Sequence, residues 1–379
     1  MVKKVVNGVI RDWGEQVGEK GLKGRKGLNV RKGQSGNRSS SAKRTSASIS
    51  TKARLQLTVS KTPEVMVKIS GGGKNMGAIS AHFDYISRNG KVEIEDENGH
   101  IHKGSDEVKE AKDSWEKGRI GIPKKGSKRK EAFNIILSMP EGTDRESVKK
   151  AAREFAKLEF ADHQYVFAAH EDEKHPHVHL SVKAVDRDGV RLNPRKADLQ
   201  KWRESFAASL RDQGIAANAT PRRARGVIRK AKKQKIQQID KAFEKGDRPV
   251  PAKMTASKDI LAKKEVKEKI VKVNPYADEI EKTREAMLKT YGKLSGHYKA
   301  GNEGDKKFVK EIEDFVKSFP SGMTDHELRV KKITGGTGDI VEEKERIKKS
   351  KKGIQKTKKQ RITKAKMKIK KPKEGDERE

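Results

Sequence analysis

The segment HEDEKHPHVHL, residues 170–180, holds four of the ten histidines of the chain. His177 and His179 are two residues apart, so on a β-strand their imidazoles project from the same face. Val178 and Leu180 then face the opposite way, toward a core. Two imidazoles on one strand face form a clamp for a divalent metal ion. The spacing therefore predicts a strand with an apolar side and a metal-binding side.

Other residues of this segment can complete the site. His170 ends a preceding strand and supplies a third imidazole if the two strands pair across the turn. Three neutral imidazoles leave a divalent ion its full charge and open positions, which suits polarisation of a phosphate oxygen. We expect Asp172 to accept the second ring N–H of one ligand. His175 precedes Pro176 in the turn and is a reserve ligand or a DNA contact. The alternative is a solvated histidine-rich edge, which the apolar alternation behind the pair disfavours.

Tyr85 is a candidate nucleophile in the segment MGAISAHFDYISRNG. At about 100° per residue, it lies roughly 120° from Ile79 on a helix, away from the apolar face. His82 and Arg88, three residues before and after it, are suited to contact DNA at a phosphate. Taken alone, Tyr85 is more simply a half-exposed amphipathic side chain. The histidine cluster favours the chemical role. The apolar face consists of Ile79, Phe83 and Ile86.

The surrounding patterns predict a domain that could position these residues. Strand patterns alternate with helical patterns and are followed by two consecutive strands and a helix. This order indicates an α+β fold with an antiparallel sheet as its core. The expected strands are 64–70, 133–140, 164–170 and 176–185, and the expected helices start near residues 76, 143 and 199.

Composition divides the chain into regions. Charged residues make up 38% and hydrophobic residues 32%, with a formal net charge of +36. The excess is +12 in residues 1–63, +5 in 64–226 and +19 in 227–379. Cationic flanks around a balanced, core-capable centre indicate binding to a polyanion such as nucleic acid. The absence of cysteine excludes disulfides, thiolate metal sites and cysteine nucleophiles.

We therefore expect four regions. The first is a disordered basic arm, and the second is the ordered, core-capable domain that carries the histidine cluster. A Lys-rich helical region with a small module near 275–320 follows, and a disordered cationic tail comes last. In this order, the four regions are expected at residues 1–63, 64–226, 227–345 and 346–379.

Four segments in this order resemble motifs of a known family. They are FDYISRNGKVEIE, NIILSMPEGTD, HEDEKHPHVHLSV and LQKWRESFAASLRDQGIAANATPRRARG. The resemblance is to conjugative relaxases of the mobilisation branch that includes the VirD-type T-DNA border endonucleases, and it covers residues 64–226. It implies a five-stranded antiparallel sheet with helices on both faces. It also implies a metal-dependent enzyme that nicks one DNA strand at an origin of transfer, for plasmid mobilisation.

The resemblance also implies roles for individual residues. Tyr85 corresponds to the nucleophile that keeps the 5′-phosphate, and Asp172 to the acidic residue of the catalytic site. Ser138 corresponds to a serine that holds DNA beside the nick. The metal ligands correspond to His170, His177 and His179. A basic run at the end of the last motif consists of Arg222, Arg223 and Arg225. These side chains are expected to contact DNA, although a solvated charge run is at least as compatible with the sequence.

The expected cofactor is a divalent metal ion, Mg²⁺ or Mn²⁺. Imidazole ligands favour Mn²⁺ or Zn²⁺, whereas cellular availability favours Mg²⁺, so the identity stays open. The expected partners are single-stranded and duplex DNA at the origin of transfer, relaxosome accessory proteins and a type IV secretion coupling protein. No apolar run reaches the roughly 18–20 residues that span a bilayer, so no membrane insertion is expected. The expected place of action is the bacterial cytoplasm, with transfer to a recipient cell alongside the DNA.

Two other functions fit parts of this sequence. A rolling-circle replication initiator shares the histidine signature but carries its tyrosine after it, which would make Tyr291 or Tyr298 the nucleophile. A non-catalytic basic DNA-binding protein would need only the cationic flanks, and its histidine patch would be incidental.

Overall fold

The computed structural model describes residues 51–334, except for 119, 123–127, 228–231, 269–273, 300 and 321. These residues form two compact units, which are described separately. The first contains residues 51–225 and 290–318, and the second contains 226–289 and 319–334. Most of the expected basic arm, and all of the expected cationic tail, lie outside the described residues.

The first unit is built on one sheet of six strands in the order β1-β4-β6-β5-β2-β3. Every neighbouring pair is antiparallel. The α+β class with an antiparallel sheet is thus confirmed, but the expected number of five strands is wrong. A short hairpin, β2–β3, extends one edge, and its strands are too short to give a clear alternation in the sequence. The strands are β1 (Met66–Gly71), β2 (Ile94–Asp96), β3 (Ile101–His102), β4 (Ala132–Ser138), β5 (Tyr165–His170) and β6 (His177–Lys183).

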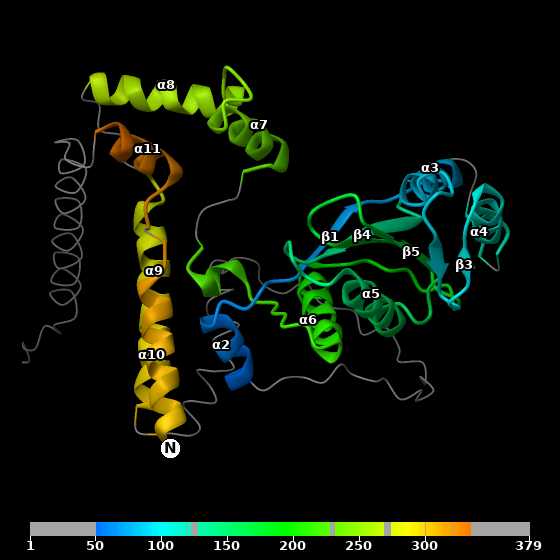
Figure 1. Ribbon diagram of the computed structural model, residues 1–379, viewed down its shortest axis with the longest axis horizontal. Helices are drawn as coiled ribbons and strands as arrows, with labels where there is room; N and C mark the ends of the chain where they lie inside the picture. Colours follow the sequence, from blue (N-terminus) through cyan, green and yellow to red (C-terminus); the bar gives the residue numbers. More distant parts are fainter. Residues whose placement is uncertain are drawn as a thin grey trace, which may run out of the picture. The chain divides into compact units, whose positions relative to one another are not determined.

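Helices cover the two faces of this sheet. Helices α5 (Arg145–Glu159) and α6 (Lys196–Asp212) lie side by side on one face (Figure 1). Helices α3 (Met76–Ile86) and α4 (Ser105–Lys117) belong to the apolar cluster of the other face. Successive residues of β5 point to opposite faces of the sheet. Phe167 packs in the apolar cluster under α5 and α6, and Val166 and Ala168 pack in the cluster under α3 and α4.

Helix α3 is held by a cap at its first turn, by a buried apolar face and by a chain reversal after its last residue. The Asn75 side chain accepts the N–H of Ala78 at 2.8 Å and caps the first turn. The predicted apolar face is buried, and the Phe83 ring meets the Trp115 ring edge-to-face at 4.9 Å. After the helix, Arg88 and Asn89 both adopt positive φ, which turns the chain sharply away. The exposed side of α3 therefore ends at a rigid reversal.

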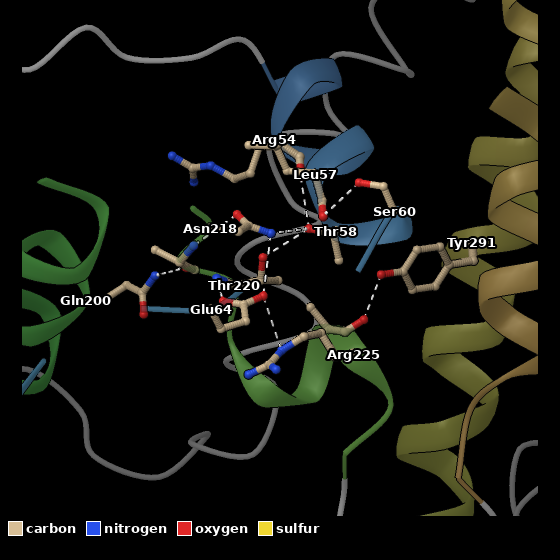
Figure 2. Close-up of polar contacts among 12 residues, drawn as sticks. Arg54, Leu57, Thr58, Ser60, Glu64, Gln200, Asn218, Thr220, Arg225 and Tyr291 are labelled. Atoms are coloured by element: carbon tan, nitrogen blue, oxygen red, sulfur yellow. Dashed lines mark hydrogen bonds and ion pairs between the residues drawn. The ribbon is translucent and has the colours of Figure 1, made fainter. Parts of the chain in front are cut away.

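A helix that composition did not predict precedes the sheet. Helix α2 (Thr51–Val59) buries Leu55 and Val59. Figure 2 shows Thr58, Asn218 and Thr220 pointing toward one another. The Thr58 hydroxyl lies 3.0 Å from that of Thr220 and accepts an N–H of the Asn218 side chain at 3.1 Å. The expectation of a disordered arm up to residue 63 is therefore wrong for residues 51–59, because partners about 160 residues away order this helix.

Further helices complete both units. The first unit also contains η1 (Arg222–Arg225), the end of α9 (Ala277–Tyr298) and α10 (Glu303–Lys317). Its aromatic pairs Tyr291–Phe315 and Tyr298–Phe308 have ring centroids 5.7 and 5.1 Å apart. The second unit contains α7 (Gln234–Glu244), α8 (Lys253–Lys267) and α11 (Asp325–Ile333). Of the helices in the described part of the chain, none is long and apolar enough to cross a membrane.

We expect Phe83→Ala to lower the free energy of unfolding of the first unit by about 3–5 kcal/mol, because it leaves a cavity under α3. Phe83 is fully buried, whereas Leu158 on α5 is 36% exposed. Leu158→Ala, in the same unit, is the control and should cost less than half as much. Urea denaturation measures both, and equal losses would contradict the assigned core.

Candidate active site

The three predicted histidines meet at one end of the β5–β6 pair. His170 is directly opposite His177, and Ala168 is opposite His179. One ring nitrogen from each histidine lies within 4.8 Å of the other two. The ring centroids are 4.6 to 5.3 Å apart. The pairing across the turn that the sequence predicted therefore occurs, and it produces a three-imidazole cluster.

Burial keeps two of these imidazoles neutral. His170 is 3% exposed and His179 is 5% exposed. Burial lowers the pKa of His170, and it lowers the pKa of His179 to about 3, with smaller contributions from neighbouring histidines. Both rings are thus uncharged at neutral pH. A neutral imidazole is the form that binds a metal ion.

Backbone carbonyls fix the tautomers of His170 and His177. The Ile86 carbonyl lies 2.7 Å from Nε2 of His170, and the His175 carbonyl lies 3.0 Å from Nδ1 of His177. A carbonyl oxygen only accepts, so these nitrogens carry the protons. Nδ1 of His170 and Nε2 of His177 keep their lone pairs. The donor set therefore fits a divalent ion, with three protein ligands and further positions open.

Asp172 has a different partner from the one expected. It was expected to accept a ring N–H from a ligand histidine, but the carbonyls of Ile86 and His175 fill that role. Its carboxylate instead accepts a hydrogen bond from the Arg88 guanidinium, a pair that sequence proximity could not indicate. Burial raises the pKa of Asp172, but the hydrogen bond and the charge of Arg88 together outweigh burial and hold that pKa below its usual value. Asp172 is therefore linked to the cluster through Arg88, and its charge also acts on His170 directly by raising the pKa of that ring.

Tyr85 lies beside the histidine cluster. Its side chain is 52% exposed on the outer side of α3. Its ring centroid is 5.5 Å from that of His179 and 6.2 Å from that of His170. The structure thus brings the predicted nucleophile and the predicted ligands together. Its exposure leaves the phenol side chain accessible to a large substrate.

Arg88 connects the phenol with the cluster. Its guanidinium carbon lies 5.0 Å from the centre of the Tyr85 ring, a cation–π contact. Its Nη2 lies 3.3 Å from Nδ1 of His170. Because that nitrogen holds the lone pair available to a metal ion, metal binding there and this hydrogen bond exclude each other. Arg88 was expected to contact DNA, and the structure gives it contacts to Tyr85, His170 and Asp172.

His82 is not a cationic DNA contact in this arrangement. Burial, with a smaller effect of His170, lowers the pKa of His82 to about 4, so the ring is neutral at neutral pH. Its ring stacks near that of Tyr85, with centroids 6.0 Å apart. Its Nε2 is buried without a hydrogen-bond partner among the described residues. His82 was expected to contact DNA near a phosphate; its neutral ring could do so only without a charge, and this contact stays a prediction.

The other predicted DNA contacts differ in their surroundings. Ser138 is opposite His177 and on the same sheet face, but it is buried. His175 and Arg222 are exposed, and the side chain of Arg223 lies outside the described residues. Arg225 pairs with Glu64 at 3.4 Å (Figure 2), so its charge serves the fold. Only Ser138 is on the histidine side of the sheet by strand register.

A cavity of about 530 Å³ beside the cluster was not predicted. His170 and His177 contribute to its wall. Arg145, at the start of α5, also donates to the carbonyls of His170 at 3.2 Å and Glu173 at 2.5 Å, and so holds the β5–β6 turn. No local motif marks these cations, because they come from separate elements. The further cationic side chains of the wall are Arg88, Lys91, Lys103 and Lys149.

Comparisons with known proteins agree with this site. Residues 85–215 match the family model described as relaxase, MobA/VirD2-like, nuclease domain. The resemblance to VirD-type relaxases that the motifs predicted is thereby confirmed for this segment. The matched segment starts at Tyr85 and includes all three clustered histidines.

Two curated relatives share this part of the chain. The T-DNA border endonuclease VirD2 of Rhizobium radiobacter is 30% identical over 183 residues, 43% of each chain. That of Rhizobium rhizogenes is 28% identical over 184 residues, 44% of this chain and 42% of its own. The chain thus spans about two fifths of the length of these relatives.

A solved structure also aligns with the chain. Its title is "Molecular Basis of Vancomycin Resistance Transfer in Staphylococcus aureus". The sequences are 15% identical, and the alignment covers 42% of this chain and 99% of the other, with a TM-score of 0.28. A TM-score this low adds nothing to the fold assignment.

We expect His179→Ala to remove one equivalent of bound Mn²⁺, because it deletes one of three converging imidazoles. His175→Ala, four residues away and exposed, is the matched control and should leave Mn²⁺ binding unchanged. The electron paramagnetic resonance signal of free Mn²⁺ measures binding. Equal binding by the two variants would place the metal elsewhere.

Proposed function

We propose that the chain is a metal-dependent DNA relaxase that nicks one strand at an origin of transfer by transesterification and supports mobilisation of a conjugative plasmid. The observation that carries this proposal is the position of the exposed Tyr85 ring beside two ligand histidines. Its centroid lies 6.2 Å from that of the His170 ring and 5.5 Å from that of the His179 ring. The match of residues 85–215 to a relaxase nuclease domain supports the same reaction. The net charge of +36 supports the binding of DNA that this reaction requires.

The proposed reaction exchanges one phosphodiester bond for another. The Tyr85 oxygen attacks the scissile phosphorus and loses its proton, and the bond from phosphorus to the 3′ oxygen breaks. The 3′ oxygen takes up a proton and leaves as a hydroxyl, while the 5′-phosphate stays on Tyr85. Because one ester replaces another, religation follows the same path in reverse. ATP is not required.

The residues around Tyr85 have separate parts in this proposal. His170, His177 and His179 hold the divalent ion, Mg²⁺ or Mn²⁺, which when bound supplies polarisation of a phosphate oxygen. Arg88 positions the phenol ring by its cation–π contact. Asp172 orients Arg88 and is a positioning residue. The neutral His82 ring packs against the phenol from the preceding turn.

DNA binding is proposed for the surfaces around the site. Ser138, His175, Arg222 and Arg223 are the proposed DNA contacts, together with the Lys91, Lys103 and Arg145 side chains of the cavity wall. The basic regions that flank the domain add salt-dependent affinity for single-stranded and duplex DNA. Relaxosome accessory proteins and a type IV secretion coupling protein are the proposed partners. The proposed setting is the bacterial cytoplasm, followed by transfer with the DNA.

The limits of the nuclease domain are also part of the proposal. The expected domain, 64–226, gains α2 at its start because Thr58 hydrogen-bonds with the segment around Asn218. The helical region is proposed at 227–345, although its residues 290–318 belong to the first compact unit, and the cationic tail is proposed at 346–379.

The rival nucleophiles are less suitable than Tyr85. Tyr291 is 1% exposed, and its hydroxyl donates to the Ala224 carbonyl at 2.6 Å (Figure 2). Tyr298 is 7% exposed, with Lys52 over its ring at 5.2 Å. A buried hydroxyl cannot reach a DNA strand without unfolding its surroundings. This disfavours the rolling-circle alternative, in which the tyrosine follows the histidines.

We expect Tyr85→Phe to abolish the covalent protein–DNA adduct, because it removes only the attacking oxygen. The substrate is a single-stranded oligonucleotide that spans the origin of transfer of the plasmid carrying this gene. Denaturing gel electrophoresis after incubation with Mn²⁺ measures the adduct, which should also disappear when EDTA removes the metal.

Two control variants make this experiment specific. Tyr276→Phe changes an exposed tyrosine, 66% accessible, and Tyr291→Phe changes the rival. Both should form the adduct at the wild-type level. An adduct that persists in Tyr85→Phe but disappears in Tyr291→Phe would establish the rolling-circle order instead. Wild-type protein that leaves DNA uncut with every divalent metal would favour the non-catalytic alternative.

A further inference from the structure

We propose that the β2–β3 hairpin is a second metal site, at which Asp96, His100 and His102 bind a divalent transition-metal ion. One carboxylate oxygen and one nitrogen from each imidazole lie within 4.8 Å of one another. None of these three residues takes part in the proposed nicking reaction. The inference therefore stands independently of it.

The hairpin turn holds Asp96 in a fixed orientation. Its Oδ1 accepts the backbone N–H groups of Asn98 and His100, both at 2.9 Å. Its own N–H donates to the His100 carbonyl at 3.0 Å. Gly99 has φ of 82°, a conformation that favours glycine and closes this tight turn. The backbone thus fixes one carboxylate oxygen and leaves Oδ2 available.

Both imidazoles are placed near this carboxylate. Nε2 of His102 lies 3.3 Å from Oδ2 of Asp96. The rings of His100 and His102 have centroids 4.9 Å apart. His102 is buried on β3 opposite Ile94, while His100 is exposed in the turn. One buried and one accessible imidazole therefore lie near the same carboxylate, and solvent can fill the remaining positions around an ion.

The donor set selects the kind of ion. Two imidazole nitrogens and one carboxylate oxygen suit Zn²⁺, Mn²⁺ and similar transition metals. Ca²⁺ and Mg²⁺ prefer sites made mainly of oxygen atoms. All three donors come from seven consecutive residues, 96–102, so the site forms whenever the hairpin forms. Zn²⁺ is the probe that this donor set favours most.

The site would add a further tie at the edge of the sheet, where Arg153 of α5 already donates to the Glu95 carboxylate of β2. Strand β2 joins β5 through only two register pairs, Glu95 with Phe167 and Asp96 with Val166. Strand β3 is the edge strand. Lys103, next to His102, lines the cavity beside the candidate active site. An ion that ties β2 to β3 would therefore also fix one wall of that cavity.

The simpler alternative is a metal-free Asp96–His102 hydrogen bond that only closes the hairpin. The test uses the full-length, untagged chain carrying His177→Ala and His179→Ala, which removes two ligands of the first cluster. Zn²⁺ binding is titrated in competition with a chromophoric chelator, and the melting temperature is followed with and without Zn²⁺. We expect one bound equivalent and a higher melting temperature with Zn²⁺.

Two ligand variants in this background make the test specific. Asp96→Asn keeps an amide oxygen for the turn hydrogen bonds but loses the carboxylate charge, and His100→Gln changes an exposed side chain. Each should weaken Zn²⁺ binding by roughly tenfold or more and remove the Zn²⁺-dependent rise in melting temperature. The metal-free melting temperatures should stay unchanged, which shows that the fold is retained.

His175→Gln is the matched control, an exposed histidine of the same unit outside both clusters. It should bind Zn²⁺ as the parent does. The proposal is overturned if the parent binds no Zn²⁺ in this competition, or if Asp96→Asn and His100→Gln bind it as tightly as His175→Gln. Either result leaves the question of DNA nicking untouched, because that reaction is tested through Tyr85.

Discussion

The register of β5 against β6 is the constraint on which the site depends. Because His170 is opposite His177, and directly opposite residues share a sheet face, three imidazoles converge from two strands. A slip of one residue would turn His177 and His179 into the apolar cluster under α5 and α6 and expose Val178 in their place. The apolar residues that alternate with the histidines, Val178 and Leu180, therefore hold the metal ligands in position by anchoring the opposite face.

Burial then determines how the converging groups behave. The pKa of His179 falls to about 3 and that of His82 to about 4, mainly because the charged forms are desolvated. Two of the ligand rings, His170 and His179, can thus bind a cation without first losing a proton. Arg88 supplies the positive charge of the immediate surroundings, and Asp172 pairs with it. Beside the phenol of Tyr85, the site thus combines two neutral ligand rings with one cation that a carboxylate pairs.

Sequence alone predicted the parts of this arrangement that depend on local periodicity. Alternation identified the face that carries His177 and His179, and helical spacing placed Tyr85 away from Phe83. What it missed depends on tertiary contacts. Helix α2 reads as a disordered arm because its order comes from Asn218 and Thr220, far along the chain. The partner of Asp172 could not be inferred either, because Arg88 reaches it only after the left-handed reversal that ends α3.

Ile86 shows how closely the nucleophile and the metal ligands are coupled. Its side chain is buried beneath α3, and its carbonyl accepts the N–H of His170 at 2.7 Å. It is also the residue after Tyr85. One peptide segment thus fixes the core, the tautomer of a ligand and the position of the phenol together. A shift at the end of α3 would change the orientation of His170 as well as that of Tyr85, so the geometry for attack and the geometry for metal binding cannot vary independently.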